Sequence, residues 1–276
     1  MDMAQQVKLA QLDLMTELDR ICKKHSLRYF MVGGTLIGAV RHNGFIPWDD
    51  DIDVGMLWED YEKLREICAQ ELDPAYWLHD WENDPNSPHP FYKLKIRGTH
   101  YREQIAGSSK MDDGIFIDIF PFDNAPEGTA AQKRQGMTLK LLRKIILVRC
   151  GFDLGKGSVP KKLVYGALKL FSYLRPLTGW KKSFQKLRTR YNTGRSAYVV
   201  NMCGAYSYEK EKKPREMMEK VVEHVFESGS FSIPEDYDTY LRGCYGDYMQ
   251  LPPEEKRVGI HHVQHIDLGG YELRSH

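Results

Sequence analysis

Four aspartates occupy five consecutive positions within the stretch GFIPWDDDIDVGM, which runs from residue 44 to residue 56. An acidic loop that only faces solvent would not interleave its charges with Ile52 and Val54. If residues 51–54 are extended, Asp51 and Asp53 lie on one face and the two apolar side chains face a core. The pattern therefore predicts a β-strand that carries two carboxylates on its polar face.

Two carboxylates held this way call for a positive partner. Their Cα atoms lie about 6–7 Å apart on an extended chain, and two charges about 5 Å apart repel by roughly 3 kcal/mol at an effective dielectric near 20. Magnesium suits one or two carboxylates combined with substrate phosphates. A calcium-binding EF-hand loop fits less well, because Val54 stands where that loop needs glycine and Asp60 where it has glutamate.

The stretch GIFIDIFPFD supplies a third carboxylate, Asp118. Asp118 lies between Ile117 and Ile119, and alternation places it on the same strand face as Phe116 and Phe120, after which we expect a loop. A lone aspartate in such surroundings is costly to bury unless it is paired or bound to a metal. Asp118 is therefore either a further metal ligand or a core acid in a salt bridge.

A glycine turn precedes the acidic strand in the stretch VGGTLIGAVR. We expect Gly33 and Gly34 to join a short strand to a helix that Thr35 caps, with Arg41 about two turns along. Backbone amides and the positive end of a helix favour an anion at such a turn. A phosphate site beside a metal site is the minimum for phosphoryl or nucleotidyl transfer.

Two further groups are candidates for substrate contacts. Lys93 and Lys95 share a strand face in FYKLKIR, and we expect Lys95 to reach a phosphate. In GIHHVQHIDLG, the residues His261, His262 and His265 have a spacing that zinc ligands on a helix can use. We favour substrate-facing roles for His261 and His262 over a zinc site.

The charge is distributed very unevenly along the 276 residues. Residues 131–195 contain seventeen lysines and arginines and one acid, a net charge of +16 in a chain whose total is +1. This basic segment allows three interpretations: a solvated helical face, a nucleic-acid patch or a membrane-surface element. Its lysines alternate with leucine, isoleucine, phenylalanine and tryptophan, which favours an amphipathic helix on an anionic lipid surface.

The remaining composition predicts a cytoplasmic protein, and the basic segment favours a peripheral position on the inner face of the membrane. No stretch has the roughly 20 apolar residues of a membrane span, and the N-terminus lacks the pattern of a signal peptide. Five scattered cysteines without a CxxC pair predict reduced thiols. The order of expected elements predicts a small mixed sheet with helices packed on it, and a further helix over residues 213–228.

The quoted motifs, together with YGDYMQLPPEEK near the C-terminus, resemble the LicD family of phosphotransferases over residues 20–265. The resemblance implies an α+β fold with a polymerase-β-like nucleotidyltransferase core, a small mixed sheet with flanking helices, plus a basic helical segment. We expect a catalytic core over residues 1–128, a basic helical insertion over 129–195 and a C-terminal helical part over 196–276 that completes the active site.

The resemblance also implies roles for individual residues. Asp51, Asp53 and Asp118 match the catalytic metal-binding carboxylates, for Mg²⁺ or alternatively Mn²⁺. The glycine turn at the donor phosphates is matched by Gly33, Gly34 and Thr35. The substrate-side signature is matched by Arg41, Trp48, Asp49 and Asp50.

The activity implied is transfer of a phospho-alcohol, most often phosphocholine, from a CDP-linked donor. The acceptor would be a hydroxyl of a cell-surface glycan or its lipid-linked precursor, with no nucleic-acid partner. Two alternatives stay open. One is a nucleotidyltransferase that adds a nucleotide to RNA or a small molecule, and the other is a non-catalytic membrane-docking protein.

Overall fold

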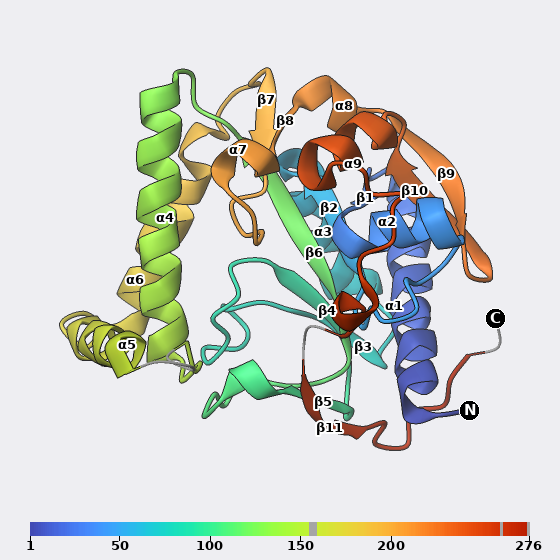
Figure 1. Ribbon diagram of the computed structural model, residues 1–276, viewed down its shortest axis with the longest axis horizontal. Helices are drawn as coiled ribbons and strands as arrows, with labels where there is room; N and C mark the ends of the chain where they lie inside the picture. Colours follow the sequence, from blue (N-terminus) through green and yellow to red (C-terminus); the bar gives the residue numbers. More distant parts are fainter. Residues whose placement is uncertain (155–158, 260–261, 275–276) are drawn as a thin grey trace.

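The computed structural model describes residues 1–154, 159–259 and 262–274. A mixed sheet lies at its centre, in the strand order β1-β2-β6-β4-β3, and β7 and β8 continue it from the C-terminal end of β6 (Figure 1). Strands β2 and β6 are parallel, and the other neighbours are antiparallel. The bounds of these strands are β1 Phe30–Met31, β2 Asp53–Leu57, β3 Tyr76–His79, β4 Tyr92–Ile96, β6 Phe116–Asn124, β7 Tyr198–Val200 and β8 Lys212–Pro214.

Helices α1 (Met3–His25) and α3 (Trp58–Glu71) pack on β6 and on each other. Helix α1 begins where a capping box satisfies its first amides: the Asp2 carboxylate accepts from the Gln5 amide at 2.8 Å, and the Gln5 side chain accepts from the Asp2 amide at 3.2 Å. It ends at Ser26, which adopts the left-handed conformation. The mixed α+β architecture expected from the element order is confirmed.

The basic segment forms three helices on one side of the sheet, α4 (Thr129–Arg149), α5 (Val159–Ser172) and α6 (Leu177–Arg188) (Figure 1). Helices α4 and α6 contribute side chains such as Leu142 and Phe184 to the main hydrophobic core. Helix α5 contacts α4. Within the described residues, every helix is too short or too polar to cross a lipid bilayer.

The C-terminal part is mixed rather than helical, so the prediction of a helix over residues 213–228 is wrong. Its elements are α7 Tyr208–Glu211, α8 Arg215–Glu219, β9 Val221–Phe226, β10 Gly229–Pro234, α9 Tyr237–Tyr245 and β11 Val263–Asp267, with β11 pairing β5 His100–Glu103. Residues 221–226 form a hairpin with β10. Three valines in six positions favour the strand, and the distant partner β10 decides the outcome.

Two local predictions near the site are also corrected. Helix α2 (Gly33–His42) begins two residues before Thr35, so Val32 and not Thr35 is the N-cap. The chain continues as β6 to Asn124 where we expected a loop after Phe120. Its last residues find partners far away in the sequence, because Asp123 and Asn124 pair with β7.

Candidate active site

Asp53 and Asp118 lie side by side on the two parallel strands at the centre of the sheet. Asp53 opens β2 and is in register with Asp118 of β6, and the Asp118 amide donates to the Ile52 carbonyl at 2.9 Å. Residues in register on neighbouring strands point to the same face of the sheet. These two carboxylates, which the motifs predicted as metal ligands, therefore come from adjacent strands and face the same side of the sheet.

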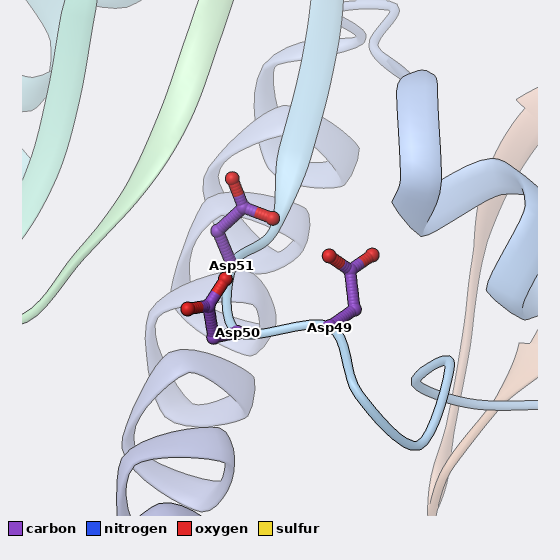
Figure 2. Close-up of side chains that lie close together, drawn as sticks. All are labelled: Asp49, Asp50 and Asp51. Carbon is purple, nitrogen blue, oxygen red and sulfur yellow. The ribbon is translucent and has the colours of Figure 1, made fainter. Parts of the chain in front are cut away.

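The three aspartates before β2 form a compact acidic turn. Asp49, Asp50 and Asp51 each offer a carboxylate oxygen within 4.8 Å of the other two. Figure 2 shows the three side chains projecting from the single segment that leads into β2. A cation at this turn would thus find ligands in Asp49 and Asp50, which we had expected to contact substrate, as well as in Asp51.

Asp53 is affected by the charges of both the acidic turn and Asp118, so we treat these five aspartates as one carboxylate cluster. Among the described residues, only Asp49, Asp50 and Asp51 of this cluster have carboxylate oxygens that all lie within 4.8 Å of one another. Burial raises the pKa of the Asp53 carboxyl well above its usual value, and the charges of Asp51, Asp118 and Asp49 raise it further. Lys93 acts in the opposite direction and is the weakest of these influences. Asp53 is therefore buried among neighbouring carboxylates whose effect on its pKa outweighs that of Lys93.

Lys93 is the cation that contacts the third carboxylate. It stands opposite Asp118 in the β4–β6 register, and its Nζ donates to Asp118 Oδ1 at 2.6 Å while lying 3.3 Å from the centre of the Phe116 ring. Lys95, for which we expected a phosphate contact, instead donates to the Asp112 carbonyl at 2.5 Å. Only 1% of Lys95 is exposed, and burial lowers its pKa to about 8.

The glycine turn faces the carboxylates directly. Gly33 has φ +61°, and a Cβ there would lie 3.1 Å from Asp53 Oδ2. A Cβ at Gly34 would overlap the Asp49 carboxylate. The Thr35 hydroxyl oxygen accepts from the Asp53 amide at 2.8 Å, so in this structure Thr35 holds the start of β2. Glycine is needed because any side chain would push the acidic groups away.

Helix α1 and β5 hold the acidic turn through its main chain. The Gln11 side chain and the Tyr101 hydroxyl both donate to the Asp50 carbonyl, at 3.0 Å and 3.3 Å. Lys8 donates to the carbonyls of residues 46–47. Sequence reasoning missed these contacts. The available signal was Gln11, a polar residue on the buried face of an amphipathic helix.

Arginines and a tryptophan border the acidic turn on another side. The Arg257 guanidinium lies 5.7 Å from the centre of the Trp48 ring, and Arg41 donates to the Tyr248 carbonyl at 2.7 Å. Burial and the neighbouring Arg257 charge lower the pKa of Arg41. Such mutual repulsion between two arginines favours an anion between or beside them.

The C-terminal segment reaches the same turn, because a Cβ at Gly259 would lie 3.1 Å from Asp50 Oδ2. A cavity of about 570 Å³ adjoins the turn. Its wall includes Lys8, Trp48, Asp49, Asp50 and Tyr101.

Of the three candidate histidines, the structure describes His262 and His265. His261 lies outside the described residues. His262 and His265 are exposed, and the His262 carbonyl accepts from the Gln104 amide.

A small mixed sheet with a carboxylate cluster beside a glycine turn defines the class of this domain. Residues 26–140 match the family described as LicD/FKTN/FKRP, nucleotidyltransferase domain. These residues, which include both paired strands and the acidic turn, form a LicD-family domain, and the resemblance noted from the motifs is confirmed.

Individual relatives extend the similarity beyond that domain. Over 265 residues the chain is 28% identical to the lipopolysaccharide cholinephosphotransferase LicD of Haemophilus influenzae, which covers 93% of this chain and 95% of that protein. Over 100 residues it is 42% identical to the human ribitol 5-phosphate transferase FKRP, which covers 35% of this chain and 17% of that protein.

Proposed function

We propose that the chain is a phosphotransferase built on a polymerase-β-like nucleotidyltransferase core. It transfers a phospho-alcohol, in the first place phosphocholine, from a CDP-linked donor to a hydroxyl of a cell-surface glycan or its lipid-linked precursor. The observation that carries this proposal is the in-register pair Asp53 and Asp118 beside the acidic and glycine turns. Similarity to a cholinephosphotransferase over nearly the whole chain supports phosphocholine.

The residues of the cluster fit a divalent cation. All donors are carboxylates, the hard oxygen ligands that Mg²⁺ and Mn²⁺ prefer, and burial together with the neighbouring carboxylates raises the pKa of Asp53. We assign Asp51, Asp53 and Asp118 as the ligands, with Asp49 and Asp50 close enough to Asp51 to take part. A bound Mg²⁺ or Mn²⁺ would neutralise charge on the donor diphosphate.

The protein's own groups would bind the donor and move the proton. The Gly33–Gly34 turn lets a donor phosphate approach the start of α2, where helix amides favour an anion. The acceptor oxygen bonds to the phosphorus that carries the alcohol, its proton passes to Asp118, and the bond from that phosphorus to CMP breaks. Lys93 orients Asp118 through Oδ1. Arg41 and Arg257 offset the charge on the departing CMP.

The cavity beside the acidic turn would receive the alcohol of the donor. Its wall combines the aromatic rings of Trp48 and Tyr101 with the carboxylates of Asp49 and Asp50. Aromatic faces and carboxylates together attract a quaternary ammonium through cation–π and charge interactions. This composition favours choline over the uncharged alcohols glycerol and ribitol.

A donor panel tests the proposal. Thermal shifts with CDP-choline, CDP-ethanolamine, CDP-glycerol and CDP-ribitol, each with Mg²⁺, should be largest for CDP-choline. With cytidine-labelled CDP-choline and a glycan acceptor, the label should leave as free CMP. The variant Asp51→Asn should lose turnover by at least about a hundredfold, while Glu216→Gln, an exposed carboxylate on α8, should keep it.

Three results would contradict the assignment. Label retained on the product, or thermal shifts with nucleoside triphosphates alone, would indicate a nucleotidyltransferase. A larger shift with CDP-ribitol would assign the ribitol donor instead. Undiminished turnover in Asp51→Asn would remove the acidic turn from the reaction.

A further inference from the structure

Helix α5 exposes an unusual amount of apolar surface. Of its described side chains only Ser172 is buried. Seven of the nineteen large hydrophobic side chains exposed among the described residues fall in residues 159–174: Val159, Leu163, Val164, Leu170, Phe171, Tyr173 and Leu174. Leu163, Leu170 and Leu174 are 70%, 75% and 79% exposed, so nothing within the described chain covers this surface.

These side chains form one continuous face. At 3.6 residues per turn, positions 163, 167 and 170 of α5 lie above one another, and Val164 and Phe171 lie beside them. Leu174 follows in the turn after the helix. The inner face of the helix carries Tyr165, whose ring lies 6.0 Å from the Lys144 ammonium of α4. An amphipathic helix normally turns its apolar face inward, whereas α5 turns its apolar face away from the rest of the protein.

Some cations of the basic segment are bound within the fold, and others are exposed on α5. Arg143, Lys181 and Arg188 donate to main-chain carbonyls of the fold, and the latter two are 6% and 1% exposed. On α5, by contrast, Lys161, Lys162 and Lys169 are exposed. They lie on the flanks of the apolar face: Lys162 and Lys169 each directly precede a leucine of that face, and Lys161 lies one helical turn before Val164 at its edge.

We propose that α5 is an interfacial helix that docks the protein on an anionic lipid surface. The exposed apolar face would insert at the boundary of the hydrocarbon region, and the lysines beside it would bind the phosphate headgroups. Nucleic acid would engage the lysines and leave the apolar face in water. A second copy of the chain would bring together two segments that each carry a net charge of +16.

The charge asymmetry also sets an orientation. Outside residues 131–195 the chain carries a net charge of −15, so an anionic surface attracts the basic segment and repels the rest. Docking through α5 therefore turns the acidic site away from the lipid headgroups. This inference does not rest on the proposed activity, because docking is measured without turnover.

Vesicle flotation tests the inference with the full chain. Vesicles of phosphatidylglycerol and phosphatidylcholine should carry the protein at low salt, and pure phosphatidylcholine should carry far less. Lys161→Gln with Lys162→Gln and Lys169→Gln should weaken binding by roughly a hundredfold, from about fivefold per lysine. Leu163→Asp with Leu170→Asp should weaken it by at least about tenfold per residue.

The matched control is Ile105→Asp with Val225→Asp, two exposed apolar residues outside the segment, which should bind vesicles like the wild type. Unchanged vesicle binding in the leucine variant would overturn the proposal. The proposal would also be wrong if light scattering showed a dimer that the leucine variant converts to a monomer. Tight binding to RNA or DNA that is lost in the lysine variant and kept in the leucine variant would equally overturn it.

Discussion

Asp53→Asn should stabilise the protein while abolishing its activity. Asp53 lies in register with Asp118, and burial raises its pKa, followed by the charges of Asp51, Asp118 and Asp49. Two charges about 5 Å apart repel by roughly 3 kcal/mol at an effective dielectric near 20, and Lys93 offsets part of this repulsion. Asparagine keeps the size of the side chain and removes the charge. We expect a net gain of about 1–3 kcal/mol in the free energy of unfolding.

The melting temperature in metal-free buffer measures this gain. For 276 residues, a change of 1 kcal/mol corresponds to roughly 2 °C, so the variant should melt about 2–6 °C above the wild type. Added Mg²⁺ should raise the melting temperature of the wild type, because a ligand of the folded state stabilises it. Most of that rise should be absent in Asp53→Asn.

Asp60→Asn is the matched control. Asp60 is 4% exposed, but its carboxylate accepts from Arg28 Nε at 3.1 Å and from the Arg28 amide at 3.3 Å. Removing a compensated charge costs stability, here about 1–3 kcal/mol, so the shift should be downward. If Asp53→Asn also melts lower than the wild type, the cluster is a compensated structural network and our interpretation of it is wrong.

Three further outcomes follow from the same contacts. Lys93→Met breaks a buried ion pair and should lower the unfolding free energy by about 3–5 kcal/mol in urea titrations, whereas an unchanged midpoint would contradict the pairing. Gly34→Ala should fold normally but lose turnover, because the new Cβ displaces the Asp49 carboxylate. Gly38→Ala should lower the melting temperature, because its Cβ meets main-chain atoms that cannot move aside. Equal melting temperatures for the two variants would contradict this difference. Burial lowers the pKa of Lys95 to about 8 in the folded protein, against an ordinary value of 10.5 in the unfolded chain. Between these two pH values the unfolded chain therefore binds more protons than the folded protein. The stability of the wild type relative to Lys95→Met should then rise with pH across this window, by up to about 3 kcal/mol in urea titrations at successive pH values, and a flat or falling difference would contradict the burial of a charged lysine.

Much of the site could be predicted from the sequence because it depends on local patterns. Alternation predicted the strand that carries Asp53, although β2 begins only at Asp53 and Asp51 lies in the turn before it. The apolar run around Asp118 predicted a buried strand. The glycine pair predicted a close approach of backbone and acidic or phosphate groups. The same reasoning failed over residues 213–228, whose pattern is compatible with a helix but whose residues 221–226 pair with β10 as a strand.

The sequence by itself determined which chemical groups the site contains and that two strands and a glycine turn carry them, because strand alternation and turn conformation are short-range properties. Only the tertiary structure decided that Lys93 and not Lys95 meets Asp118, since both lysines share a face and the register of β4 against β6 selects between them. It also decided that Gln11 and Gly259 reach the acidic turn, and that α5 alone of the basic helices leaves its apolar face uncovered. These outcomes depend on contacts between residues far apart in the chain, which no local pattern encodes.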